Sequence, residues 1–197
     1  MPLHPLGAED FLFAMRYLID RVERICRDIK NEVENDIYAV KERDPAARSS
    51  LEILLTNQGI HAILLYRVAH LLDSKKHRFI AKLISQFARF FTGIEIHPSA
   101  KIGRRLLIDH GAGVVVGETA EVGDDCTIFH GVTLGGTGKE KGKRHPTLRD
   151  GVFVGAGAKI LGNIEIGANA KIGANAVVLV DVPENATAVG IPARIIK

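Results

Sequence analysis

Tryptophan is absent from this sequence of 197 residues, and aromatic residues make up only 6% of it. There are only two cysteines, Cys26 and Cys126, and they lie far apart in the chain. Such a pair forms neither a disulfide framework nor the close spacing of a metal-binding knuckle, which favours a reducing compartment. The N-terminal segment MPLHPLGAED lacks the charged and then apolar pattern of a secretory signal. We therefore expect a cytoplasmic protein.

Long apolar runs and dense charge are also missing. The best candidate for a membrane span, Ile60 to Leu72, is interrupted by His61, Arg67 and His70, so we expect no membrane association. The formal net charge is only +3, without a dense basic stripe. This favours at most an anionic small ligand, and we expect no nucleic-acid partner.

The first 93 residues have the pattern of a helical region. Apolar residues recur there at intervals of three and four, which is typical of helices. A first helix is expected to end near Asp44, which precedes a proline. Ser49 and Glu52 have the spacing of a capping box, so a second helix is expected to start there and run through Leu71. A third helix is predicted over 78–91.

After Gly93 the apolar period changes to six. A period of six matches neither a helix nor a single strand, but it matches one short strand followed by one corner. Three such units close a triangular coil of about 18 residues, and the coils stack as a solenoid. Many of these apolar residues are followed by glycine, which we expect to supply backbone angles that other residues resist. The repeating positions are Ile96, Ile102, Ile108, Val116, Val122, Ile128, Leu134, Leu148, Val154, Ile160, Ile166, Ile172 and Val178.

These patterns predict an α+β protein with two parts. Residues 1–93 form the helical N-terminal region, and residues 94–197 form the solenoid. The spacing widens between Leu134 and Leu148, so residues 135–147 are predicted to form an extruded loop. Loops on a rigid scaffold commonly carry function, and Arg144 and His145 stand at the end of this one.

His110 is the main candidate for chemistry in the solenoid. It follows Asp109 at a point where the six-residue period slips, so it is expected at an irregular corner. Glu95 is expected at the same corner one coil away, where its carboxylate would orient the imidazole as in a catalytic dyad. Adjacent strand residues point to opposite faces, so Asp109 is better suited to meet a ligand ammonium. From spacing alone, a solvated corner explains these residues equally well.

Several longer motifs resemble one known family. The motifs IDHGAGVVVGET, GVTLGGTGK and RHP, with the later GIPARI, are similar to those of the serine O-acetyltransferases, which are hexapeptide-repeat acyltransferases. The resemblance covers about residues 44–197. It implies a left-handed parallel β-helix, an exception to the usual right-handed crossover rule. It also implies trimers, or dimers of trimers paired through the helical region, with active sites between neighbouring coils.

The resemblance also implies residue roles and a reaction. Acetyl-CoA would be the cosubstrate, L-serine the acceptor, and O-acetylserine, the precursor for cysteine synthesis, the product; no metal is expected. His110 matches the general base, and Glu95 stands where the family carries an aspartate partner. Asp44 and Asp109 match residues that bind the serine amino group, and Arg144 and His145 match those that hold its carboxylate. The positions that line the CoA groove are Gly136, Thr137, Ala156, Gly157 and Lys171.

The sequence departs from longer family members at its end. It stops at Lys197, five residues after Pro192, without the C-terminal tail that docks cysteine synthase. We therefore expect no tail-mediated complex, whereas inhibition by L-cysteine at the serine site needs only the serine-binding residues.

Three alternatives follow from the same residues. One is an acetyltransferase for another hydroxyl, such as that of a sugar, although an ammonium-and-carboxylate clamp is better suited to an amino acid. Another is a zinc enzyme like carbonic anhydrase, which needs three converging histidines, with His97, His110 and His130 as candidates. The last is a scaffold without catalysis, which leaves the glycine-rich loop without a role.

Overall fold

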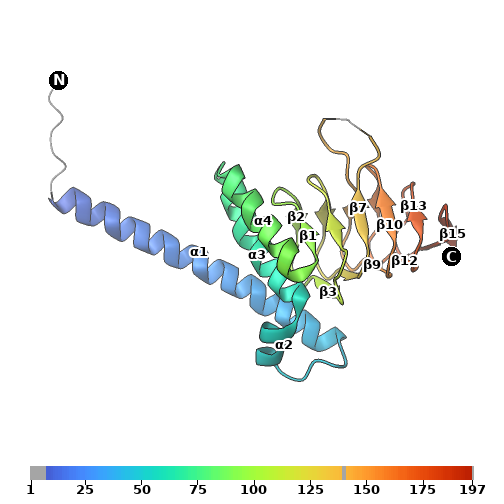
Figure 1. The fold of residues 1–197 in the computed structure, drawn as a ribbon, viewed down its shortest axis with the longest axis horizontal. Coiled ribbons are helices and arrows are strands. Elements are labelled where there is room, and N and C mark those ends of the chain that lie inside the picture. The colour runs from blue at the N-terminus through green and yellow to red at the C-terminus, as the bar shows by residue number, and fades with distance from the viewer. Residues whose placement is uncertain (1–7, 139–140, 197) are drawn as a thin grey trace.

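The computed structural model describes residues 8–138 and 141–196. Four helices at the N-terminal end are followed by a solenoid of short strands, and α1 extends away from the rest as a long rod (Figure 1). Among the described residues, no helix is long and apolar enough to cross a bilayer. The helices are α1 Ala8–Arg43, α2 Ser50–Thr56, α3 Gln58–Ser74 and α4 Arg78–Thr92.

The helix predicted to begin near Ser49 does begin there, but it is not continuous. The Ser49 hydroxyl accepts the main-chain N–H of Glu52 at 3.1 Å, which confirms the cap. The chain then turns at Asn57, whose backbone leaves the helical region. The Asn57 side chain accepts the N–H of Ile60 at 3.0 Å and so starts a new helix. The single helix predicted from Ser49 to Leu71 is therefore wrong, because an asparagine cap divides it into α2 and α3.

Three parallel sheets form the faces of the solenoid. Sheet A has the order β1-β4-β7-β10-β13, sheet B has β11-β8-β5-β2, and sheet C has β15-β14-β12-β9-β6-β3. Only β14 and β15, at the C-terminal end, pair antiparallel among the described strands. The bounds are β1 Glu95–Ile96, β2 Lys101–Ile102, β3 Leu107–Asp109, β4 Val115–Val116, β5 Glu121–Val122, β6 Thr127–Phe129, β7 Thr133–Gly135, β8 Thr147–Leu148, β9 Phe153–Val154, β10 Lys159–Leu161, β11 Glu165–Ile166, β12 Lys171–Ile172, β13 Val177–Val178, β14 Thr187–Val189 and β15 Arg194–Ile196.

The chain passes from sheet A to B to C and back to A in each coil, so the solenoid has three corners. The A–B corner includes residues 97–100, 117–120, 136–138 and 141–146. The B–C corner includes 103–106, 123–126 and 149–152, and the C–A corner includes 110–114, 130–132 and 155–158.

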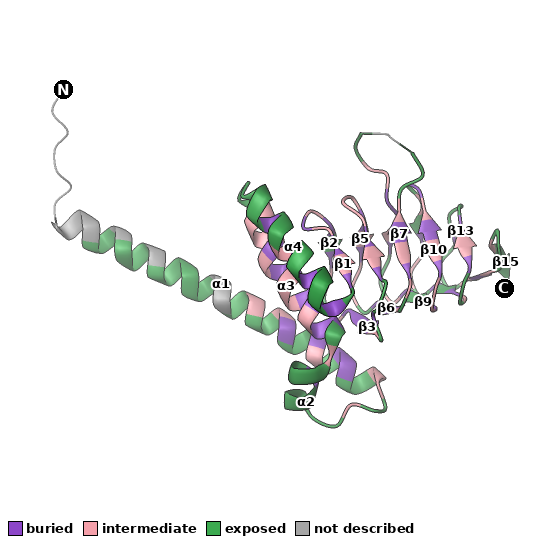
Figure 2. Ribbon diagram, in the orientation of Figure 1, coloured by how far each residue is buried: buried purple, intermediate pink, exposed green. Residues whose placement is uncertain are grey.

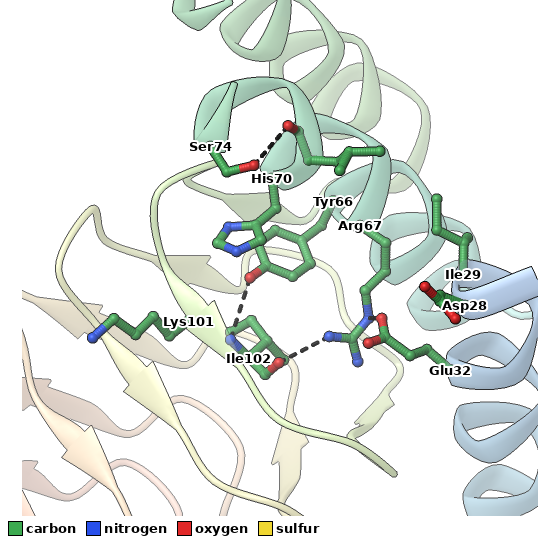
Figure 3. A pocket seen from close by; sticks show the side chains of 10 residues that line it. Asp28, Ile29, Glu32, Tyr66, Arg67, His70, Ser74, Lys101 and Ile102 are labelled. Atoms are coloured by element: carbon green, nitrogen blue, oxygen red, sulfur yellow. Dashed lines mark hydrogen bonds and ion pairs between the residues drawn. The ribbon is translucent and has the colours of Figure 1, made fainter. Parts of the chain in front are cut away.

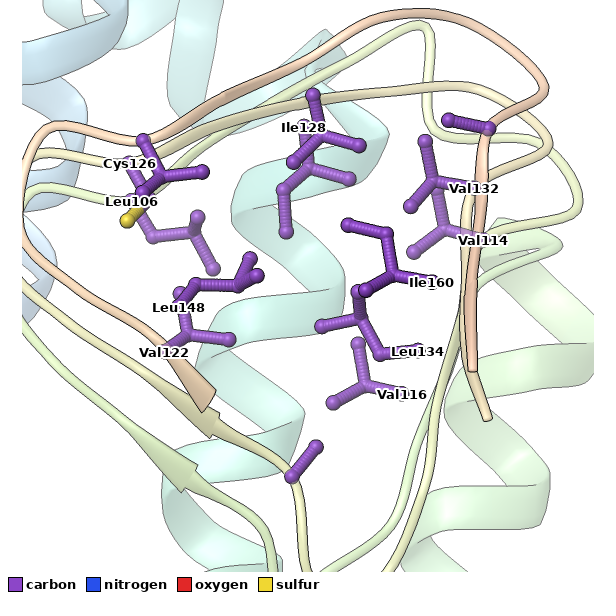
Figure 4. Close-up of a cluster of buried hydrophobic side chains, with 14 of the residues drawn as sticks. Leu106, Val114, Val116, Val122, Cys126, Ile128, Val132, Leu134, Leu148 and Ile160 are labelled. Atoms are coloured by element: carbon purple, nitrogen blue, oxygen red, sulfur yellow. The ribbon is translucent and has the colours of Figure 1, made fainter. Parts of the chain in front are cut away.

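The apolar positions predicted from the six-residue period form the core. All thirteen are buried, and Leu134, Val154 and Ile160 are among those with no exposed surface. Residues of successive coils lie in register, for example Val116 beside Leu134 and Leu134 beside Ile160. Figure 4 shows these side chains filling the triangular interior, with Cys126 among them. Each stacked aliphatic side chain removes apolar surface from water, which stabilises the coil.

The glycines after these apolar residues have a different role from the one predicted. Gly103, Gly117 and Gly123 do not adopt left-handed angles, which occur at other residues of the corners such as Asp125 and Gly131. A Cβ on Gly103 would lie 2.7 Å from the main-chain carbon of Gly123. The glycines are therefore required because successive coils approach too closely for a side chain.

Cys126 is a core residue, as its place in the repeat indicates. It has no exposed surface, and burial raises the pKa of its thiol to about 12. The thiol is therefore unreactive at neutral pH. The side chain of Cys26, the other cysteine, lies outside the described residues.

A buried arginine joins the helices to the first coil. Arg67 of α3 donates to the carbonyls of Ile102 at 2.8 Å and Gly103 at 2.6 Å. It also pairs with Asp36 of α1, which has no exposed surface. Figure 3 shows Arg67 reaching past Tyr66 toward β2, with Glu32 beside it. Figure 2 shows buried residues concentrated where the helices meet the solenoid, and exposed residues along the free part of α1.

Candidate active site

The predicted site residues fall into two groups at different corners. Asp109 and His110 lie where β3 leads into the C–A corner. Arg144 and His145 lie at the A–B corner, at the end of the loop between β7 and β8. A triangular coil keeps its corners apart, so one copy of the chain does not bring the two groups together.

His110 has an exposed side chain on a constrained backbone. Its φ is +58°, in the left-handed region, and its side chain is 75% exposed. Its Nε2 lies 3.9 Å from Oδ1 of Asp109, and the His130 ring of the next coil lies 6.1 Å away, edge to face. Left-handed backbone is uncommon for residues other than glycine and asparagine. The turn therefore holds the imidazole out from the corner, where a ligand can reach it.

Glu95 lies close to this corner but pairs with another residue. The N–H of Gly113 donates to the carbonyl of Gly93 at 2.8 Å, so the turn after His110 adjoins the segment that enters β1. The Glu95 carboxylate, however, forms an ion pair with Arg89 of α4 at 3.1 Å. No ion pair joins Glu95 to His110 among the described residues. Glu95 therefore lies on β1 next to the C–A corner, and its pairing with His110 stays a prediction.

Asp44 lies directly after α1. The preceding residue, Arg43, donates to the carbonyl of Asp125 at 3.0 Å and to the carbonyl of Cys126 at 3.3 Å. The Asp44 carboxylate accepts the N–H of Ala46 at 2.8 Å. The bonds of Arg43 place Asp44 next to the B–C corner, where the strands of sheet C begin, whereas Asp109 stands at the end of β3.

The A–B corner is a dense hydrogen-bonded cluster. His145 is 8% exposed, and its Nδ1 lies 2.8 Å from the Thr119 hydroxyl. The Arg144 guanidinium pairs with the carboxylate of Glu118. The N–H of Arg144 donates to the Thr119 hydroxyl at 3.0 Å. The His145 ring lies over Gly117 of the preceding coil, where a Cβ would be 2.2 Å from Nε2.

The charges of this cluster shift its pKa values. Burial is the main cause that lowers the pKa of His145, and the Arg144 cation lowers it further. The hydrogen bond from Arg144 lowers the pKa of Glu118. Burial also lowers the pKa of His97, which lies at the same corner. At neutral pH the corner therefore presents a guanidinium and neutral imidazoles, a donor set suited to a carboxylate.

The residues predicted to bind CoA are also divided. Gly136 and Thr137 begin the extruded loop at the A–B corner, and a Cβ on Gly162 would lie 3.6 Å from the Thr137 hydroxyl. Ala156 and Gly157 lie at the C–A corner, where the N–H of Gly157 donates to the His130 carbonyl at 2.8 Å. The remaining residue, Lys171, is exposed on β12 in sheet C.

The sequence reasoning gave no role to Glu118 and Thr119. Both are in the motif IDHGAGVVVGET, which was the available signal. Their partners, Arg144 and His145, lie 26 residues away in sequence. Only the stacking of one coil on the next brings these residues together.

The arrangement within one copy is unsuited to the zinc alternative. Across residues 8–138 and 141–196, no group of three or more His, Cys, Asp or Glu side chains is placed to hold a metal ion. His97 lies at the A–B corner, whereas His110 and His130 lie at the C–A corner. The three candidate ligands therefore do not converge in one chain.

Comparison with known proteins places the chain in a family. Residues 12–64 match the N-terminal model of serine acetyltransferases, and residues 145–179 match the bacterial transferase hexapeptide model. A serine acetyltransferase of Bacillus licheniformis is 61% identical over 164 residues, which are 83% of this chain and 76% of that protein.

Solved structures agree in fold. A Neisseria gonorrhoeae serine acetyltransferase in complex with serine has a TM-score of 0.83 at 46% identity, over 85% of this chain and 69% of that one. A serine acetyltransferase in complex with cysteine has a TM-score of 0.87 at 48% identity, over 94% of this chain and 77% of that one. With its helical region, its parallel solenoid and this level of identity over most of its length, the chain belongs to the serine acetyltransferase family of hexapeptide-repeat acyltransferases.

Proposed function

We propose that this protein transfers the acetyl group of acetyl-CoA to the hydroxyl of L-serine, giving O-acetyl-L-serine and CoA. The observation that carries the proposal is the pair of corners with complementary chemistry. One corner offers an exposed imidazole next to a carboxylate, and the other offers a guanidinium and a neutral imidazole donor. An amino acid with a hydroxyl needs all three functions: a base, an anion for its ammonium and cations or donors for its carboxylate. The reaction is the first step from serine toward cysteine.

His110 acts as the general base in this proposal. A serine hydroxyl is a weak nucleophile, so its proton must be removed as the oxygen attacks the thioester carbonyl. His110 accepts that proton, and the collapse of the tetrahedral intermediate expels the CoA thiolate, which takes up a proton. Glu95, near the same corner, would orient the imidazole after giving up Arg89. Asp109 and Asp44 hold the serine ammonium.

The carboxylate of serine would be held by Arg144 and His145. A guanidinium suits a carboxylate because its planar N–H groups match both oxygens. The same contacts would bind L-cysteine and allow it to inhibit, because it differs from serine only in the side-chain heteroatom. The relatives with serine and with cysteine bound support this assignment by their ligands.

Acetyl-CoA would lie along the edge between coils. Gly136 and Thr137 from one corner and Ala156 and Gly157 from another offer main-chain groups without bulky side chains. Lys171 is exposed and provides a cation for a phosphate of CoA. No resident metal takes part in this scheme.

A complete site would require a second copy of the chain. The C–A corner of one copy and the A–B corner of its neighbour together would supply the base, the Asp109 carboxylate for the ammonium, and the donors for the carboxylate. The apolar side of α4 supports such an assembly, because a monomer rarely exposes so much contiguous apolar surface. Its exposed side chains are Phe79, Ile80, Leu83, Phe87, Phe90 and Phe91. We infer a homotrimer working in the cytoplasm, with the helical region 1–93 contributing Asp44 and contacts between copies.

The release of CoA from acetyl-CoA tests the proposal directly. The purified protein would be assayed with L-serine, homoserine, a sugar and no acceptor. Release that depends on serine and is suppressed by added cysteine is the expected result. Release only with another acceptor would keep His110 as the base but overturn the roles of Asp44, Asp109, Arg144 and His145. No release with any acceptor would contradict the proposed reaction.

A further inference from the structure

Thr119 connects the two residues assigned to the substrate carboxylate. Its hydroxyl lies 3.0 Å from the N–H of Arg144, 3.2 Å from the N–H of His145 and 2.8 Å from Nδ1 of the His145 ring. Its own N–H lies 3.2 Å from the same Nδ1, and its carbonyl accepts Lys143 Nζ at 2.7 Å. One threonine of the second coil therefore holds three consecutive residues of the loop between β7 and β8 in the third coil.

The directions of these hydrogen bonds determine the tautomer of His145. A hydroxyl has one hydrogen and two lone pairs. The two main-chain N–H groups use the lone pairs of Thr119, which leaves its hydrogen for Nδ1. The N–H of Thr119 also points at Nδ1, so this nitrogen is an acceptor from both sides. Because burial lowers the pKa of His145, the neutral ring carries its proton on Nε2.

The protonated nitrogen is available to a ligand. Among the described residues, Arg67 Nε is the only fully buried side-chain nitrogen or oxygen without a hydrogen-bond partner. No hydrogen-bond partner of His145 Nε2 occurs within 8–138 and 141–196, and this atom is not fully buried, so part of its surface is exposed. It is thus an N–H donor held on a rigid corner beside the Arg144 guanidinium, which is itself anchored by Glu118.

We propose that Thr119 is a positioning residue that selects acceptors bearing a carboxylate, by fixing His145 as an Nε2–H donor next to Arg144. This inference rests on the proposed function, because it assumes that the acceptor's carboxylate binds at this corner. All the hydrogen bonds of Thr119 among the described residues go to Lys143, Arg144 and His145. Its loss therefore affects recognition of serine and leaves the chemical step intact.

Substitution of the hydroxyl tests the proposal. Thr119→Val keeps the shape and removes the oxygen, Thr119→Ser keeps the oxygen, and Thr187→Val is a matched control on β14, where no side-chain hydrogen bond of the threonine occurs among the described residues. Initial rates of CoA release would be measured with L-serine and with ethanolamine, which is serine without its carboxylate. Thr119→Val is expected to raise KM for serine about tenfold, the effect of losing one or two hydrogen bonds. KM for acetyl-CoA and turnover of ethanolamine stay unchanged, and Thr119→Ser and Thr187→Val resemble the wild type.

A double-mutant cycle distinguishes positioning from a direct effect. In the His145→Gln background, the further substitution Thr119→Val should raise KM for serine only slightly more, because the two residues act through one contact. Equal losses with serine and ethanolamine, or a raised KM for acetyl-CoA, would show a general structural role and overturn the proposal. If the valine variant does not fold, Thr119→Ala replaces it, and failure of both to fold also overturns it. A wild-type protein that is inactive toward serine refutes the proposed function. If the wild type is active and Thr119→Val has the same KM for serine, only the role of Thr119 is refuted.

Discussion

At the scale of single residues, the backbone of His110 decides how its role can be tested. A φ of +58° is strained for alanine but tolerated by asparagine. Asparagine also lacks a group that takes up a proton near neutral pH. His110→Asn therefore removes the base without disturbing the turn.

We expect His110→Asn to lower kcat by about 10²–10⁴, the usual contribution of a general base, with little change in KM. The side chain is 75% exposed, so the fold should be retained, which circular dichroism checks. His130→Asn removes the imidazole next to His110 and is the matched control, which should lower kcat much less. Unchanged turnover of His110→Asn would remove His110 from the mechanism.

The ion pair of Glu118 with Arg144 makes part of the protein's stability depend on pH. The Arg144 hydrogen bond lowers the pKa of Glu118 below its ordinary value of 4.5 in the folded state. A carboxyl with a depressed pKa contributes stability above its unfolded pKa, and that contribution is lost as pH falls through the folded pKa. The Glu118 side chain is 43% exposed, so solvent screening keeps the effect below about 1 kcal/mol.

Glu118→Gln should therefore lower the free energy of unfolding at pH 7 and have no effect below the folded pKa of Glu118. Urea titrations at pH 7, 5 and 3 measure the difference from the wild type. Glu184→Gln, at an exposed residue without an ion pair among the described residues, is the control. A difference that stays constant from pH 7 to pH 3 and does not shrink as the pH falls would contradict the assignment of the effect to this ion pair.

At the scale of elements, the junction between the helices and the first coil depends on one buried cation. Burial raises the pKa of Asp36, and the Arg67 guanidinium opposes this shift. Glu32 lies 3.2 Å from Arg67 Nε as an ion pair without a hydrogen bond. Close packing adds to the junction, since a Cβ on Gly59 of α3 would lie 2.4 Å from the Ile108 carbonyl.

Arg67→Met should destabilise the protein by about 3–5 kcal/mol, because it leaves a buried carboxylate without its partner. The double variant Arg67→Met/Asp36→Leu should recover much of this loss, since it removes both charges. Denaturation by urea measures each variant. Arg27→Met, which breaks an exposed pair with Glu23 at 3.5 Å, is the control and should change stability by less than about 1 kcal/mol. An equally small effect of Arg67→Met would show that the junction is held by apolar packing alone.

At the scale of the whole molecule, the separation of the two corners has a consequence for mixed oligomers. If each site combines the C–A corner of one copy with the A–B corner of another, two defective copies can form an intact site between them. His110→Asn disables the first corner, and Arg144→Ala disables the second.

Each of these variants alone should be nearly inactive, whereas trimers that contain both should recover up to about a third of the wild-type activity, because one of their three sites combines the two intact corners. Co-expression with two affinity tags and sequential purification isolates the mixed species. Mixing His110→Asn with His110→Asn carrying the second tag is the control. Mixed oligomers without recovered activity would contradict a site shared between copies.

The sequence by itself determined the architecture and the types of side chain available for a site. A strict period of six leaves one solution, a coil of short strands, because each inward aliphatic residue must be buried and each corner must be tight. The family motifs then predicted His110, Arg144 and His145 as site residues. These inferences rest on local motifs or on periodicity, so they need no knowledge of which residues are in contact.

Tertiary structure decided what depends on the stacking of coils. It showed that glycines such as Gly103 serve close approach between coils. It also brought Thr119 to His145 across 26 residues of sequence. Such contacts join residues whose separation in sequence is set by the length of a coil and its loop, so no local pattern records which side chains meet.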